Sequence, residues 1–200
     1  LLRIGVAGRD VPTAALPAAN LVFLVDVSGS MDAPDKLPLL QSSLKLLVRQ
    51  LRKQDRITLV TYAGSTAVVL PPTSGDQQTR IVEAIDSLQS GGGTAGASGI
   101  ELAYKAAQQA YLRGGINRIL LATDGDFNVG VTDFDQLKGM VAEKRRSGVA
   151  LSTLGFGTGN YNDTLMEQLA DAGDGAYAYI DSALEARKVL THELGSTLAT

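Results

Sequence analysis

Two short apolar runs, each followed closely by an aspartate, constrain most strongly what this chain can fold into. Residues 21–25 are apolar throughout and stop at Asp26. A second apolar run, 119–122 within a predicted strand over 118–123, is followed by Asp124 one residue later. A strand that is apolar on both faces is typical of the centre of a parallel sheet, where helices cover both sides. The two runs therefore predict buried strands of an α/β fold.

The rest of the chain alternates between helical and strand patterns. Apolar spacings of three and four predict helices over 35–53, 77–89, 97–112, 133–147, 163–172 and 182–198. Further strands are predicted over 57–62, 66–70, 149–156 and 176–180. The link between 57–62 and 66–70 is too short for a parallel crossover, so these two form a hairpin. Pro71 and Pro72 end the second of them, which suits an edge.

This pattern predicts a doubly wound, Rossmann-like fold of class α/β. Its sheet is mostly parallel and six-stranded with one antiparallel edge strand, and helices cover both faces. Residues 20–200 are expected to form one domain, and residues 1–19 a flanking strand and a linker that holds Pro12 and Pro17.

Composition excludes several classes of protein. The formal net charge of the 200 residues is −3, with both signs interspersed, so no basic stripe for nucleic acid is present. The chain has no cysteine, which excludes disulfide scaffolds, cysteine zinc sites and thiol catalysis. No apolar run reaches the roughly 18 residues that a membrane-spanning helix needs. The chain starts with leucine and looks like a piece of something longer, so we expect targeting signals to lie outside it.

Oxygen-bearing side chains follow the predicted buried strands. Asp26, Ser28 and Ser30 come directly after the first strand, Asp124 follows the second, and Thr94 lies in a glycine-rich loop over 90–96. Ligands of open α/β sheets bind outside the carboxyl ends of the strands. Carboxylates and hydroxyls suit Mg²⁺, with Ca²⁺ or Mn²⁺ as alternatives, better than zinc. The sequence thus predicts a divalent-metal site.

These motifs carry a family resemblance. Asp26-Val-Ser28-Gly-Ser30, then Gly93-Thr94 and Thr123-Asp124-Gly125, resemble the metal-ion-dependent adhesion site (MIDAS) of von Willebrand A domains. The resemblance implies that Ser28 and Ser30 bind the metal directly. It implies that Asp26, Thr94 and Asp124 bind directly or through water, and that a protein partner supplies an aspartate or glutamate as the last ligand.

A narrower resemblance points to a bacterial group. Residues 20–36, 122–131 and 154–163 are similar to YfbK-type proteins, in which such a domain sits inside a larger envelope-associated chain. The resemblance implies a bacterial cell-envelope location, periplasmic or extracellular and possibly lipid-anchored, with the cytoplasm as the alternative. We expect no membrane contact by this fragment itself.

Loop residues near the predicted metal end are candidates for a rim around the partner's carboxylate. Asp126 could orient a metal-bound water or be a solvated loop acid. The loop residues could line the rim or be variable surface; they are Met31, Phe127, Asn128, Asn160 and Tyr161.

The expected function is a metal-ion-dependent protein-binding module and not an enzyme. Hydroxyl ligands and only two formal charges leave the ion incompletely neutralised, so it would attract an outside carboxylate. The alternatives are a metal-assisted phosphoryl-transfer or hydrolytic enzyme, or a structural domain of a larger envelope protein. Residues 91–96 match G-x-G-x-x-G but follow a predicted helix, which disfavours a dinucleotide site. His192 is the only histidine, which disfavours zinc ligation and a catalytic triad.

Overall fold

A six-stranded sheet forms the middle layer of the computed structural model, which describes residues 16–93, 96–125, 134–157 and 163–190. The strand order is β3-β2-β1-β4-β5-β6; all neighbours are parallel except the β2–β3 pair. The strands are β1 (Ala19–Asp26), β2 (Arg56–Tyr62), β3 (Thr66–Ser74), β4 (Ile116–Thr123), β5 (Ala150–Phe156) and β6 (Tyr177–Ile180). The predicted fold class, including the antiparallel edge strand, is confirmed.

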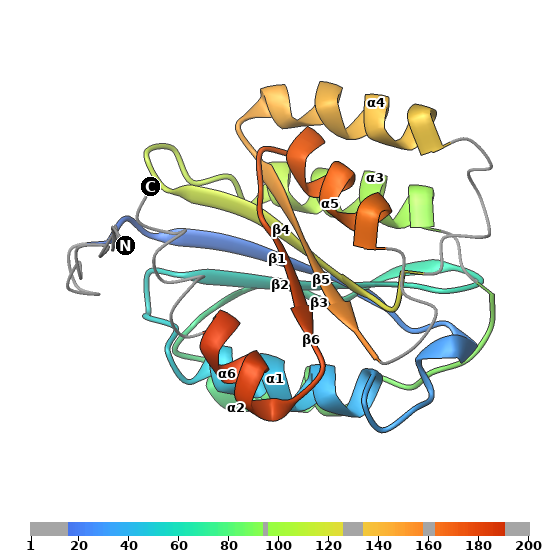
Figure 1. The fold of residues 1–200 in the computed structure, drawn as a ribbon. Helices are drawn as coiled ribbons and strands as arrows, with labels where there is room; N and C mark the ends of the chain where they lie inside the picture. Colours follow the sequence, from blue (N-terminus) through green and yellow to red (C-terminus); the bar gives the residue numbers. More distant parts are fainter. Residues whose placement is uncertain (1–15, 94–95, 126–133, 158–162, 191–200) are drawn as a thin grey trace, which may run out of the picture.

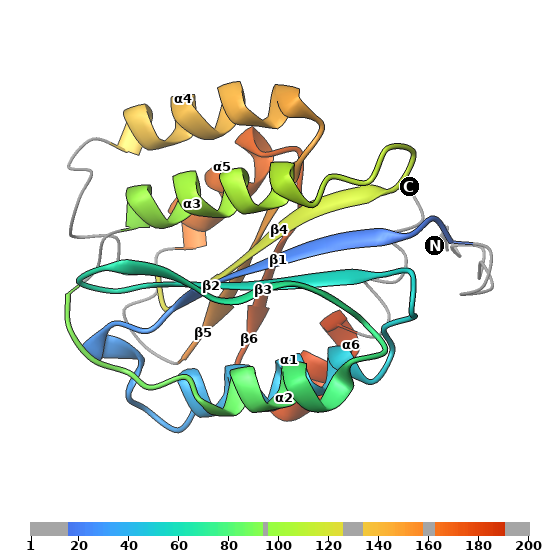
Figure 2. The same cartoon turned by 180° about the vertical axis from the view of Figure 1, so that it is seen from behind.

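Helices cover the sheet on both faces. Figures 1 and 2 show α1, α2 and α6 on one side and α3, α4 and α5 on the other. The helices are α1 (Leu37–Val48), α2 (Gln78–Asp86), α3 (Gly96–Gln109), α4 (Phe134–Lys144), α5 (Asp163–Ala172) and α6 (Ala183–Lys188). The predicted strand at 1–6 and the end of the predicted helix 182–198 lie outside the described residues.

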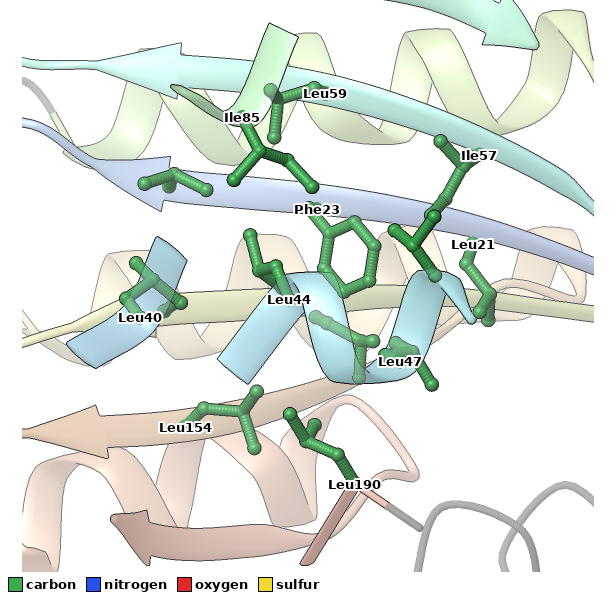
Figure 3. Close-up of a cluster of buried hydrophobic side chains, with 14 of the residues drawn as sticks. Leu21, Phe23, Leu40, Leu44, Leu47, Ile57, Leu59, Ile85, Leu154 and Leu190 are labelled. Atoms are coloured by element: carbon green, nitrogen blue, oxygen red, sulfur yellow. The ribbon is translucent and has the colours of Figure 1, made fainter. Parts of the chain in front are cut away.

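The central strands are buried on both faces, as their apolar sequences predict. In β1, Leu21 and Phe23 belong to the core under α1 and α2, whereas Val22 and Leu24 belong to the core under α3. Figure 3 shows the first of these cores, in which Phe23 packs near Leu44 of α1. The carboxylates of Asp26 and Asp124 lie at or just beyond the carboxyl ends of β1 and β4, whereas Arg118 lies within β4 and donates to Ser152 of β5.

The prolines of the edge strand do not end it, and this prediction was wrong. β3 continues through Pro71 and Pro72 to Ser74, and its pairing with β2 shifts from Leu59–Leu70 to Ile57–Thr73. A shift of this kind is a β-bulge, which places an extra residue in one strand. β3 has a neighbour on one side only, and a proline whose missing N–H faces away from that neighbour costs no ladder hydrogen bond.

Asp55 lies at the end of the sheet where β1 and β2 begin, and its hydrogen bonds hold this end together. Asp55 accepts hydrogen bonds from the backbone N–H of Ala19 at 3.0 Å and from the backbone N–H of Arg52 at 2.7 Å. The Arg52 guanidinium donates to both of its oxygens, at 2.7 and 3.0 Å. Burial alone would raise the pKa of Asp55, but the hydrogen bonds and the charge of Arg52 outweigh burial and lower this pKa. Asp55 therefore ties the start of β1 to the turn before β2.

Replacing this carboxylate should destabilise the fold in a pH-dependent way. We expect Asp55→Asn to lower the free energy of unfolding by about 2 kcal/mol, because buried donors lose their acceptor. Since the folded pKa is lowered, this difference should be complete above the ordinary aspartate pKa of about 4 and vanish as pH falls through the folded pKa. Urea unfolding at several pH values measures it.

The matched control is Asp86→Asn. Asp86 pairs with Lys45 on the surface, and its side chain is 52% exposed against 5% for Asp55. An exposed ion pair contributes about 0–1 kcal/mol. Equal losses in the two variants would contradict the anchoring role of Asp55.

Candidate metal site

The candidate site lies where the direction of chain winding reverses. β1 pairs with β2 on one side and with β4 on the other, while α1, which follows β1, and α3, which precedes β4, cover opposite faces. Ligand crevices of open α/β sheets form at such a switch point, outside the carboxyl ends of the strands. The register pairs Val25 with Ala122, so Asp26 and Asp124 end up at the tips of neighbouring strands.

Asp26 is completely buried and fully oriented by its neighbours. One carboxylate oxygen, Oδ1, accepts the backbone N–H of Ser28 at 2.9 Å. The other, Oδ2, accepts the hydroxyl of Thr123 at 2.8 Å and that of Tyr62 at 3.2 Å. Burial raises the pKa of Asp26, the hydrogen bonds from Ser28 and Thr123 counteract it, and the nearby charge of Asp124 raises it further. A cation next to this carboxylate would favour its charged form.

The turn after β1 brings two hydroxyls together. Gly29–Met31 forms a single turn of 3-10 helix, and Ser28 Oγ lies 3.0 Å from Ser30 Oγ. Ser28 is 2% exposed, whereas Ser30 is exposed to solvent. The alternating Asp26, Ser28 and Ser30 therefore converge at the end of β1, as the spacing predicts.

The glycine-rich loop approaches this turn, as expected. The N–H of Gly29 donates to the carbonyl of Gly92 at 3.1 Å, and the N–H of Gly91 donates to the carbonyl of Val27 at 2.8 Å. Gly92 adopts a φ of +83°, in the left-handed region that favours glycine. The loop is thus fastened beside the serines, but Thr94 itself lies outside the described residues.

A lysine joins the two halves of the site. Lys36 Nζ donates to Asp124 Oδ2 at 2.8 Å and to the backbone carbonyl of Ser30 at 2.9 Å. The side chain of Asp124 is 6% exposed, so this ion pair is shielded from water on the Asp124 side. Lys36 was not among the predicted site residues.

Of the residues predicted to form a rim around the partner's carboxylate, Met31 lies within the described residues. Met31 is completely buried in the core that includes α1, so the expectation that it lines an exposed rim was wrong. The 3-10 turn directs its long apolar side chain inward, where burial is favourable. The other predicted rim residues lie outside the described residues; they are Asp126, Phe127, Asn128, Asn160 and Tyr161.

Sequence reasoning missed two contributors to the site, Tyr62 and Lys36. Tyr62 was predicted only as the last residue of a strand, although its hydroxyl donates to Asp26. Thr123 was named as part of the motif but without a contact, and its hydroxyl also donates to Asp26. Lys36 carried a signal that could have been used, because it directly precedes α1. A cation at a helix N-terminus is electrostatically unfavourable unless a negative group compensates for it.

The donor chemistry fits a hard divalent cation. The site offers two carboxylates and two hydroxyls, and oxygen ligands of this kind suit Mg²⁺, Ca²⁺ or Mn²⁺. Within the described residues, no group of three or more histidine, cysteine, aspartate or glutamate side chains could hold a metal. A purely carboxylate or histidine site is therefore not what this part of the chain provides.

Comparison with known proteins identifies relatives of the same kind. A family model described as the von Willebrand factor type A domain matches residues 20–193. The uncharacterized protein YfbK of Escherichia coli K12 is 52% identical over 200 residues, which is 100% of this chain and 35% of that protein. The chain thus spans about a third of that relative's length. Both the predicted family and the narrower similarity to YfbK are confirmed.

Solved structures share the fold at low sequence identity. BatB from Bacteroides thetaiotaomicron has a TM-score of 0.75 and 21% identity, covering 91% of this chain and 99% of that one. Proximal thread matrix protein 1 from the mussel byssus, solved with a zinc-occupied MIDAS motif, has a TM-score of 0.69 and 21% identity. It covers 92% of this chain and 46% of that one. These likenesses establish the fold alone.

The hydrogen bond from Thr123 to Asp26 should contribute measurably to stability. Thr123 Oγ1 also accepts the N–H of Gly125 at 3.1 Å, so Thr123→Val removes the acceptor of that N–H and one of the two hydroxyl donors to Asp26 Oδ2. We expect this variant to lose about 2 kcal/mol of unfolding free energy in urea titrations with EDTA.

Thr58→Val, in strand β2, is a matched control. Thr58 is also fully buried, but its hydroxyl has no hydrogen-bond partner among the described residues. Removing an unsatisfied hydroxyl should be neutral or stabilising. If Thr58→Val cost as much as Thr123→Val, the effect would come from packing and not from the hydrogen bond to Asp26.

Proposed function

The chain belongs to the von Willebrand factor type A family, and on that premise we propose that it is a metal-ion-dependent protein-binding module. One observation carries the proposal. Ser28 Oγ and Ser30 Oγ lie 3.0 Å apart beside the carboxylates of Asp26 and Asp124, at the switch point of the sheet. These are the residue types and the location that a MIDAS requires.

Each side chain has a distinct role in this proposal. Ser28 and Ser30 bind the ion directly through their hydroxyls, and Thr94 adds a third hydroxyl from the glycine-rich loop. Asp26 already accepts three hydrogen bonds, and an ionised carboxylate has about four acceptor positions. This occupancy favours contact between Asp26 and the ion through water. Asp124 supplies the second negative charge.

Mg²⁺ is the proposed ion, with Ca²⁺ or Mn²⁺ as alternatives. Mg²⁺ prefers six oxygen ligands and commonly keeps several waters, which suits a site with few charged donors. Zinc occupies the MIDAS of the mussel protein, so the fold alone does not dictate the ion. When bound, the cation supplies a positive charge that attracts an aspartate or glutamate of a protein partner.

Binding is proposed in preference to catalysis because of what surrounds the serines. Two-metal hydrolysis uses a dense carboxylate cluster and an activated water. Of the predicted acids near the site, Asp26 is occupied by hydroxyl and amide donors and Asp124 by Lys36. Asp126 lies outside the described residues.

Residues 20–200 are proposed as the binding module, within a longer envelope protein.

The envelope location stays a prediction. Among the helices in the described part of the chain, none is both long and apolar enough to cross a membrane.

Removal of either acid should weaken metal binding. We expect Asp26→Ala and Asp124→Ala to lower Mg²⁺ affinity by about tenfold or more in isothermal titration calorimetry, the range seen when groups supporting a metal site are removed. Asp86→Ala is the control, because Asp86 pairs with Lys45 on the exposed surface of α2. Equal affinity in all four proteins would reject the site.

Partner capture should require both metal and site. We expect the immobilised chain to retain a protein partner in Mg²⁺ and release it in EDTA, and Asp124→Ala to retain none under either condition. Asp86→Ala should behave like the wild type. Capture that ignores EDTA would contradict the proposal, as would metal-dependent hydrolysis of p-nitrophenyl phosphate that Asp124→Ala abolishes.

A further inference from the structure

The ammonium group of Lys36 lies inside the candidate metal site. It contacts Asp124 Oδ2 at 2.8 Å and the carbonyl of Ser30 at 2.9 Å, so it bridges the segments after β4 and β1. A cation in this place does part of what a divalent ion would do, because it neutralises a carboxylate that is 6% exposed.

The aliphatic part of the Lys36 side chain packs against Gly157, and this contact surface is called the Lys36 seat. A Cβ atom placed on Gly157 would come within 2.7 Å of Lys36 Cε and 2.9 Å of Lys36 Cγ, so the aliphatic stem lies directly against this glycine. Gly157 follows β5 and has a φ of +92°. Its carbonyl accepts a hydrogen bond from the Tyr179 hydroxyl of β6. The seat of Lys36 thus comes from strands other than those that carry the serines.

Helix geometry makes this placement dependent on Asp124. Lys36 is the residue at the N-terminal cap of α1, and the first turn of α1 contains no acidic residue. The N-terminus of a helix carries a partial positive charge that repels a cation. The ion pair with Asp124 compensates for that repulsion, and compensation is lost when another cation neutralises Asp124.

From these contacts we propose that Lys36 is a tethered counter-ion of Asp124 that competes with the divalent cation and so lowers the metal affinity of the site. This inference rests on the proposed metal site and adds a residue that regulates it. A unit charge 2.8 Å from one carboxylate oxygen weakens the attraction of the same carboxylate for a second cation. When the metal binds, the ammonium group of Lys36 therefore either moves away from Asp124 or stays and repels the metal ion, which weakens metal binding.

Substitution of Lys36 separates this role from a structural one. We expect Lys36→Gln to raise Mg²⁺ affinity by about tenfold in calorimetric titration, since the repulsion of a nearby unit charge is removed. Lys36→Arg keeps the charge and should keep the lower, wild-type affinity. Lys45→Gln is the matched control on α1, because Lys45 pairs with the 52% exposed Asp86 and not with a site residue.

Thermal unfolding gives a second readout. In EDTA, Lys36→Gln should lower the Tm by about 3 °C, because Asp124 is left buried without its counter-ion. The double variant Lys36→Gln/Asp124→Asn should recover most of that loss. In saturating Mg²⁺ the Tm of Lys36→Gln should equal or exceed that of the wild type, whereas Lys45→Gln should track the wild type in both buffers.

The outcomes distinguish this inference from the proposed function. If Mg²⁺ binds in a manner that depends on Asp26 and Asp124, yet Lys36→Gln binds it equally or more weakly, the competition is overturned and the metal site stands. If metal binding is indifferent to Asp26 and Asp124, the metal site fails and the competition with it. If Lys36→Gln binds Mg²⁺ and the wild type does not, this result supports the competition directly.

Discussion

The buried carboxylate of Asp26 is the group on which the rest of the site depends. It has no solvent exposure, and its hydrogen bonds come from the turn after β1, from Thr123 of β4 and from Tyr62 of β2. A buried charge is costly unless donors surround it. The carboxyl ends of three neighbouring strands are therefore held in one relative position. Gly99 of α3 supports this arrangement, because a Cβ there would come within 2.8 Å of Tyr62 Cβ.

Topology then concentrates polar groups around this carboxylate. The carboxylates of Asp26 and Asp124 follow apolar stretches of β1 and β4, and the reversal of winding between these strands keeps helices from covering the end of that pair. Ser28 and Ser30 follow β1 and Asp124 follows β4, so their polar groups lie beyond the ends of neighbouring strands. Lys36 donates to Asp124 and to the Ser30 carbonyl, so the chain itself places one cation among these groups.

Much of this arrangement could be predicted from the sequence. The run over 21–25 predicts the central strand, and the spacing of Asp26, Ser28 and Ser30 places their side chains together, because alternate residues of the turn converge. The errors have a common origin in the environment of single residues. Met31 was expected at the surface but is buried, and Pro71 and Pro72 were expected to end a strand that continues through them. Local sequence does not reveal which side of a turn faces the core, or whether an edge strand ends at a proline or continues through it.

The sequence by itself determined the fold class and the family and predicted a set of oxygen donors, because apolar periodicity and motif spacing are local properties. Only the tertiary structure decided what each donor contacts. The pairing of Lys36 with Asp124 joins residues that are 88 positions apart, and that of Thr123 with Asp26 joins residues 97 apart. Such contacts depend on strand order and helix placement, which arise from packing of the whole chain. The tertiary structure thus decided that the ammonium group of Lys36 lies between Asp124 and Ser30, two of the predicted metal ligands.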